Sequence, residues 1–278
     1  MSTDGVVLLS ADDLAAIRQA RALLEAPSLV QQMTELIGTP IEQLARKLPI
    51  SLQQQIHASV IKALHQASRT AIWSLDQQAD KPATLLGHKL AVAASGFAGG
   101  WFGVAGLLLE IPVSTTIMMR SIADIARSEG RNLQETSTQL ACLEVFALGG
   151  ARNKAAASDT AYYASRLALA ELTELSAQEL IEMSSQAGMP AFAAKQASKW
   201  LSRFIEAIAS RFGVVITEKS AAQIVPVIGA ATAATLNTLF MRHYQNLARG
   251  HFIIKRLEQD YGLEPVKQAY LGLARQGE

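Results

Sequence analysis

Apolar residues recur every three or four positions along most of this chain, which is the spacing of one face of an α-helix. Leu14, Ile17, Ala20 and Leu24 are an early example. No run alternates like a half-buried strand, and the one short β-branched run, residues 212–217, predicts an isolated extended piece. The pattern therefore predicts an all-α fold, a single large helical domain with little or no sheet.

Capping signals divide the first third of the chain. Gly38 is expected to end one helix, and Thr39 with Glu42 forms a capping box that opens the next helix. A long amphipathic helix is predicted over residues 52–75, followed by a polar linker over 76–82. We therefore expect an N-terminal helical region over residues 1–80 and the main helical domain over 81–278.

Similar signals continue downstream. Gly130 is expected to end a helix, and Asn132 with Glu135 to cap the next one. The other predicted boundaries are a break at Gly149-Gly150, a capping box formed by Ser176 and Glu179, and a turn at residues 188–190.

Two long stretches carry almost no charge. Residues 90–119 contain Glu110 as their only ionisable group, and residues 220–241 contain none. Each is long enough to cross a bilayer as a helix, which takes about 20 apolar residues. Each also contains a proline, Pro112 or Pro226, which is unusual for a surface helix. We expect both stretches to be buried side by side at the centre of the domain, with transmembrane insertion as the alternative.

The first charge-poor stretch has five glycines within residues 90–109. They favour two short helices joined by a turn, with Phe97, Trp101 and Phe102 at or near its tip. The plainer interpretation is a tightly packed, buried hairpin. The alternative is insertion into a membrane interface, for which an apolar tip with tryptophan is suited. These three residues are therefore candidates for contact with a membrane or a ligand.

The second charge-poor stretch is less suited to lipid, because serine, glutamine, threonine and asparagine interrupt it. Pro226 would break a helix near the start of the stretch. We expect one long helix from Ala230 past Gly250, buried at first and emerging by Arg242.

Composition narrows the function classes. The net charge of the 278 residues is +1, and a nucleic-acid partner would require a basic patch. The single cysteine, Cys142, excludes an intramolecular disulfide and fits a reducing compartment. Residues 1–13 lack the basic and apolar regions of a secretory signal. We expect a cytoplasmic protein that binds no nucleic acid.

Glu110 is the polar residue of greatest interest, because a buried carboxylate is costly unless it is paired or protonated. Arg120 is the first cation that follows it, and Asp124 shares a helix face with Arg120. The predicted arrangement is a buried Glu110–Arg120 ion pair, supported by the hydroxyl groups of residues 114–116. The alternative is a catalytic or ligand-binding cluster.

The histidines do not suggest a metal site. His243 and His251 are eight residues apart, as are His57 and His65, whereas a helical pair of metal ligands has a spacing of four. No phosphate loop, dinucleotide fingerprint, calcium loop or nucleophile elbow is present, so no metal or cofactor is predicted. The candidate catalytic residues are Glu110, Arg120, Asp124, His243 and His251.

A weak internal sequence repeat is present at the end of each charge-poor stretch. Residues 119–127 and 241–249 share a Met-Arg pair, a four-residue gap, and an apolar-Ala-Arg triplet. The repeat is either a chance similarity among alanine-rich helices or the remnant of a duplicated unit. In such a unit a buried helix would continue into a basic amphipathic helix.

Several strings between residues 87 and 262 together resemble the EcsC protein family. They are Gly99-Gly100-x-Phe102-Gly103, Glu110 to Thr116, Arg120-Ser121-Ile122, Cys142 to Gly150, Tyr162-Tyr163 with Arg166, Ile224 to Ala230, Asn237, Phe240, His243, Ala248 to Phe252, and Leu257-Glu258. The family is named for a protein encoded with an ABC transporter that affects the secretion and processing of exported proteins. The resemblance therefore implies a membrane-linked accessory protein and assigns no catalytic mechanism.

The leading hypothesis is a non-enzymatic cytoplasmic protein that associates with the membrane surface or with a membrane protein complex of the ABC-transporter type. Two alternatives stay open. One is a hydrolase for a lipid-like substrate, with Glu110, Arg120, His243 and His251 in one apolar cleft. The other is a carrier that holds a lipid or acyl chain between the charge-poor helices.

Overall fold

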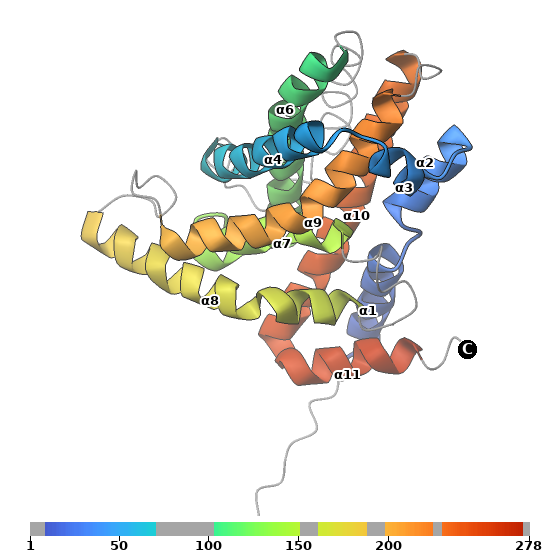
Figure 1. Ribbon diagram of the computed structural model, residues 1–278. Helices are drawn as coiled ribbons and strands as arrows, with labels where there is room; N and C mark the ends of the chain where they lie inside the picture. The colour runs from blue at the N-terminus through green and yellow to red at the C-terminus, as the bar shows by residue number, and fades with distance from the viewer. Residues whose placement is uncertain (1–8, 71–102, 151–160, 188–197, 225–229, 275–278) are drawn as a thin grey trace, which may run out of the picture.

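The computed structural model describes residues 9–70, 103–150, 161–187, 198–224 and 230–274, and in these residues it contains ten α-helices and no strand (Figure 1). The predicted all-α fold is confirmed. The helices are α1 (Ala11–Leu24), α2 (Leu29–Ile37), α3 (Ile41–Arg46), α4 (Ile50–Thr70), α6 (Gly103–Ser128), α7 (Thr136–Gly150), α8 (Ala161–Ala187), α9 (Lys199–Ile224), α10 (Ala230–Tyr261) and α11 (Leu263–Ala274).

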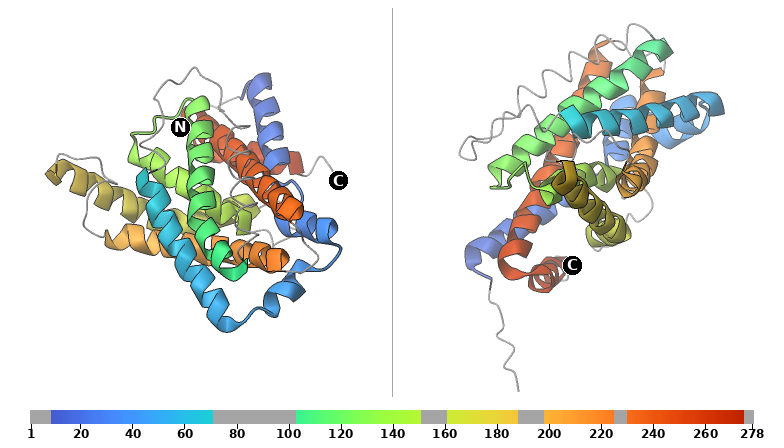
Figure 2. Two further views of the ribbon diagram at one scale, coloured as in Figure 1. Left: turned by 90° about the horizontal axis from the view of Figure 1, so that it is seen from above. Right: turned by 90° about the vertical axis from the view of Figure 1, so that its left-hand side faces the viewer.

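Helices α6 and α10 pack against each other and run in the same direction. Asn237 hydrogen-bonds to Glu110 near the start of both helices, and Gln245 donates to Ser121 farther along both. Helix α4 crosses α6 and α9, while α7 and α8 lie along α9 (Figures 1 and 2). Helices α1 and α11 cover the lower part of α10. The helices that precede residue 80 thus share one core with those that follow it.

The described parts of the two charge-poor stretches lie side by side, as predicted. Residues 103–119 belong to α6, and residues 220–224 and 230–241 belong to α9 and α10. The long helix does begin at Ala230, but the prediction that it emerges by Arg242 is wrong. Arg242 itself is exposed, whereas most side chains from Tyr244 to Leu257 are buried, because α1, α7 and α11 pack against the second half of α10.

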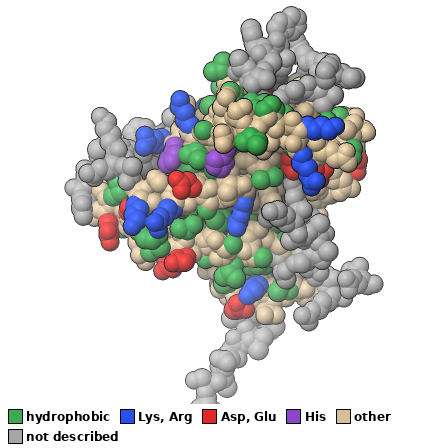
Figure 3. Space-filling view, in the orientation of Figure 1, with side chains coloured by type: hydrophobic (Ala, Val, Ile, Leu, Met, Phe, Trp, Pro, Cys, Tyr) green, Lys and Arg blue, Asp and Glu red, His purple; other side chains and the backbone are tan. Residues whose placement is uncertain are grey.

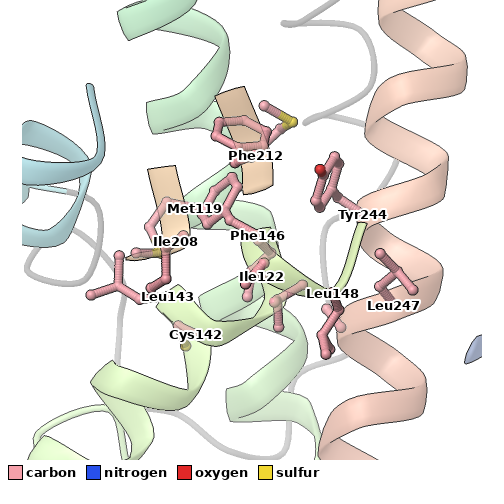
Figure 4. Packing of buried hydrophobic residues seen from close by; sticks show 14 of the residues in the cluster. Met119, Ile122, Cys142, Leu143, Phe146, Leu148, Ile208, Phe212, Tyr244 and Leu247 are labelled. Carbon is pink, nitrogen blue, oxygen red and sulfur yellow. The ribbon is translucent and has the colours of Figure 1, made fainter. Parts of the chain in front are cut away.

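Aromatic side chains fill the centre of the core between α7, α9 and α10 (Figure 4). The ring centroid of Phe212 is 4.8 Å from that of Phe146 and 5.5 Å from that of Tyr244. All three side chains are fully buried, and each of the two phenylalanines contributes about 1.5–3 kcal/mol to folding by leaving water. Helix α7 ends at Gly149 and Gly150, and it packs closely against this core at these two residues. The predicted break therefore coincides with a close contact between helices.

Two predicted helix stops are confirmed. Gly38 and Gly130 have φ values of 70° and 78°, the left-handed conformation that glycine adopts at helix ends. The prediction of a capping box at Thr39 is wrong, because α3 begins after Pro40 without a side-chain cap. Thr34 accepts the Ile41 N–H instead, at 3.4 Å.

Two other local predictions are also wrong. Helix α8 passes through Ser176 without a boundary, and the Glu179 carboxylate caps another helix by accepting the backbone N–H groups of Lys199 and Trp200 at the start of α9. Residues 212–217 are helical within α9, because burial on several sides of the helix outweighs the β-propensity of the run. Asn132 caps only the turn before α7, where its side chain accepts the Gln134 N–H.

Candidate functional site

Glu110 lies in the second turn of α6 and faces α9 and α10. It is 5% exposed, and the Lys219 ammonium, also buried, donates to its Oε1 at 2.6 Å. Gln223 donates to Oε2 at 3.3 Å, and the side chain of Asn237 makes a further hydrogen bond. These four side chains from three helices form a buried polar group that we call the Glu110 cluster.

Two opposing influences set the charge of Glu110. Burial, the larger single one, raises the pKa of the carboxyl group. The Lys219 charge and the hydrogen bonds from Lys219, Asn237 and Gln223 together outweigh burial, and the pKa of Glu110 lies below its ordinary value. The carboxylate is therefore ionised at neutral pH and serves as the partner of Lys219.

The predicted ion pair between Glu110 and Arg120 is wrong. The two residues stand ten positions apart on one helix, which separates them by about 15 Å along the helix axis. Arg120 is partly buried, and its Nε makes no hydrogen bond to the residues that the structure describes. Asp124, which shares a helix face with Arg120, pairs through its carboxylate with Arg127 at 2.7 Å.

A second buried polar group joins α7, α8 and α10. His251 is fully buried, with Nδ1 3.0 Å from the Tyr162 hydroxyl and Nε2 3.6 Å from Oε2 of Glu144. Arg166 holds both oxygens of Glu258 at 2.6 and 2.8 Å and reaches the Tyr162 hydroxyl at 3.4 Å. We call these five residues the His251 network.

The contacts of Tyr162 favour one tautomer of His251. The Tyr162 oxygen accepts from Arg166, so its own proton is available to His251 Nδ1. A neutral imidazole then carries its proton on Nε2, which faces the Glu144 carboxylate. Burial, followed by the positive charges of Lys255 and Arg166, places the pKa of His251 well below its ordinary value, which keeps the ring neutral.

The structure does not bring the candidate catalytic residues into one cleft. The Glu110 cluster includes Asn237, and His251 lies 14 positions after Asn237 on α10, which corresponds to about 21 Å of helix. His243 lies between the two groups and is buried, with its ring 5.4 Å from that of Tyr244. The candidate contact residues Phe97, Trp101 and Phe102 lie outside the described residues.

The described part of the surface contains a groove between α3, α4 and α9. Its volume is about 410 Å³, and acidic and basic side chains lie over these helices on this face (Figure 3). We call it the α3–α9 groove. It is lined by Glu42, Ala45, Arg46, Gln53, His57, Ser210, Gly213, Val214, Thr217 and Glu218.

Sequence reasoning missed this groove. None of its lining residues is among the five candidate catalytic residues, and the histidine spacing rule had set His57 aside. The signal was nevertheless present in part, because Glu42 and Arg46 share one face of a short helix, as do Gln53 and His57 on the next. Gly213 allows α4 and α9 to come together here. The His57 ring lies beside it, and a Cβ added at residue 213 would be 3.2 Å from His57 Nδ1.

The fold and the two buried polar groups define an all-α protein in which buried ion pairs and hydrogen bonds join charge-poor helices. The chain belongs to the EcsC protein family, whose model matches residues 12–257. The match begins in α1, far upstream of the strings that carry the resemblance in the sequence. Several of those strings meet in space, because Glu110 and Asn237 belong to one polar group and Glu144, Tyr162 and His251 to the other.

Neither the curated proteins nor the solved structures include a match to this chain. Among the helices that the structure describes, none combines the length and apolar character needed to span a bilayer.

Proposed function

We propose that this protein is a non-enzymatic accessory that binds the cytoplasmic surface of a membrane through the start of α6. The observation that carries the proposal is the pair Leu109 and Val113, which are 74% and 49% exposed within the charge-poor stretch. They stand four residues apart and therefore share one face of α6. Glu110, between them, turns inward to Lys219.

This arrangement gives the start of α6 two different faces. The inner face is held by the Glu110–Lys219 ion pair, so the helix cannot rotate to bury Leu109 without breaking that pair. The outer face leaves large apolar side chains in water. Single exposed apolar residues are common, but this pair continues a stretch that carries Phe97, Trp101 and Phe102 upstream. A lipid surface is the partner suited to an exposed apolar pair in a stretch whose sequence includes tryptophan.

The buried polar groups support a role without catalysis. Glu110 is occupied by Lys219, and His251 is fully buried and neutral. A general acid or base must come within hydrogen-bond reach of its substrate. Family membership supports the membrane link through the transporter-associated protein for which the family is named.

Vesicle flotation tests the proposal. The wild-type protein is expected to float with vesicles that contain anionic lipid, and mild alkali is expected to release it. The double variant Leu109→Ser/Val113→Ser removes apolar contact that contributes about 1.5–3 kcal/mol per side chain, so the bound fraction should fall at least tenfold. Both side chains are exposed, so the melting temperature should change little.

Leu167→Ser/Ile181→Ser is the matched control, because these residues of α8 are 78% and 57% exposed. The control should float like the wild type. Equal flotation of both double variants, or a wild-type protein that stays in the soluble fraction, contradicts the proposal. Resistance to carbonate extraction contradicts the peripheral mode of binding.

A further inference from the structure

We propose that one face of α4 and α9 binds the headgroups of anionic lipids. Four exposed cations define this surface, which we call the α4–α9 basic face: Lys62 and Arg69 of α4, and Lys199 and Arg203 of α9. The inference rests on the proposed function for the membrane as partner. It adds a selection by charge that the apolar pair at the start of α6 does not provide.

The basic face carries several positive charges and a single negative one. Helix α4 contains no aspartate or glutamate, and the first half of α9 contains one carboxylate, Glu206. The two cations of each helix are seven positions apart on α4 and four apart on α9, so each pair shares one side of its helix. None of the four cations forms an ion pair with a residue that the structure describes. Their charges are therefore available to a partner.

The cations of the two helices belong to one surface. Helices α4 and α9 pack against each other, and His65 of α4 is affected by charges on both helices. Burial and the charge of Arg69 lower the pKa of His65, whereas the charge of Glu206 on α9 opposes them. Figure 3 shows basic and histidine side chains close together over these two helices. A lipid surface that meets α4 here therefore also meets α9.

Trp200 adds an aromatic ring beside two of the cations. Lys199 Nζ is 5.2 Å and Arg203 Cζ is 5.0 Å from the centroid of the Trp200 ring. Tryptophan next to lysine and arginine is typical of helices at a bilayer interface, where the cations meet phosphates and the ring lies at the headgroup level. Stacking on a nucleic-acid base needs a ring face that is free, and here the two cations cover the ring.

The nearest carboxylate of α8 does not neutralise the basic face. Glu179 accepts the backbone N–H groups of Lys199 and Trp200 and the hydroxyl group of Ser198, so its charge is matched by the start of α9. Four cations and Glu206 leave a surplus of three positive charges. Each cation near an anionic bilayer strengthens binding about fivefold. Phosphate groups of anionic lipids are thus the partner that fits this surface.

Vesicle binding at two lipid compositions tests the inference. Full-length protein is titrated with vesicles of phosphatidylcholine alone and with vesicles that also contain phosphatidylglycerol, and the bound fraction is measured by co-sedimentation. Wild-type protein is expected to bind the anionic vesicles more tightly. High salt should remove this preference, because it screens exposed charges.

The double variant Lys199→Gln/Arg203→Gln should weaken binding to the anionic vesicles about tenfold or more and leave binding to the neutral vesicles unchanged. Lys62→Gln/Arg69→Gln should have the same effect from α4, where no helix cap is nearby. The matched control is Arg18→Gln/Arg242→Gln, which removes two exposed cations from α1 and α10. It should bind like the wild type. Circular dichroism melts show whether each variant is folded.

Equal binding of wild-type protein to both kinds of vesicle overturns the inference. So does a control variant that loses as much binding as the two variants of the basic face. Competition by duplex DNA that is tighter than binding to the anionic vesicles overturns the assignment to lipid.

The variant Leu109→Ser/Val113→Ser separates this inference from the proposed function. It should bind both kinds of vesicle more weakly but keep the preference for phosphatidylglycerol. Undiminished binding by this variant contradicts the proposed role of α6, whereas the preference still tests the basic face. Folded variants of the basic face that keep the full preference contradict this inference and leave the proposed function standing.

Discussion

Glu110 Oε1 and Lys219 Nζ lie 2.6 Å apart although the two residues are 109 positions apart along the chain. The pair fastens the start of α6 to the end of α9. Lys219 is also the last cation before the second charge-poor stretch. The ion pair thus joins the first charge-poor stretch to the residue that directly precedes the second.

Breaking this pair should destabilise the fold. Glu110→Gln or Lys219→Met leaves the other charge buried without a partner, at a cost of about 3–5 kcal/mol. Chemical denaturation monitored by circular dichroism measures the loss. The double variant Glu110→Gln/Lys219→Met should recover part of it, because no uncompensated charge remains.

Arg120→Met is the control for this prediction. Arg120 has no ion pair with Glu110 in the structure, so its removal should cost much less than removal of Lys219. An Arg120→Met variant that unfolds as readily as Lys219→Met, or a stable Glu110→Gln variant, would show that the Glu110–Lys219 pair does not support the fold.

Stability should decrease in mildly acidic solution because of His251. Its folded pKa lies well below the unfolded value of 6.5, so between these values the unfolded chain takes up a proton that the folded chain excludes. The contribution of neutral His251 to the free energy of unfolding is complete above about pH 6.5. It is lost as the pH falls, by up to about 1.4 kcal/mol per pH unit. Melting temperatures measured from pH 7 to pH 5 should follow this slope.

His251→Gln should be less stable at pH 7 but should depend less on pH in that range. The stability of this variant should still decrease slightly with falling pH because of His65, whose pKa is also lowered by partial burial. An unchanged pH profile in His251→Gln would assign the slope to other groups.

The contact between α7 and α9 should not tolerate a side chain at Gly150. A Cβ there would be 2.5 Å from the backbone oxygen of Arg211, which cannot move aside. Gly150→Ala should therefore destabilise by about 1–3 kcal/mol, as overpacking does. Gly272→Ala in α11 is the matched control, because no atom lies within 4 Å of its Cβ position. That variant should be stabilised by up to about 1 kcal/mol. Thermal melts that rank the two variants in the opposite order would contradict the close approach.

The cap that Glu179 provides for α9 should contribute measurably. Glu179→Ala removes the acceptor for the Lys199 and Trp200 N–H groups, at a cost of about 1 kcal/mol. Glu182→Ala, at an exposed position one turn later on α8, should have little effect. Equal unfolding midpoints for the two variants would show that the cap does not contribute.

The sequence determined the features that depend on near neighbours. The spacing of apolar residues defined the all-α fold, and Gly38 and Gly130 marked helix ends because only the local backbone conformation is needed there. The same local reasoning identified Glu110 as a buried carboxylate that needs a partner. It failed at residues 212–217, where contacts with other helices overrode the local β-propensity.

Only the tertiary structure decided which distant residues meet. Lys219 rather than Arg120 pairs with Glu110, because residues ten positions apart on a helix lie too far apart along its axis while a neighbouring helix brings Lys219 close. Glu179 likewise caps α9 instead of a helix of its own. The α3–α9 groove exists only because residues of three helices, α3, α4 and α9, meet in space. Helix packing sets all of these distances, and periodicity along the chain carries no information about which helix faces will meet.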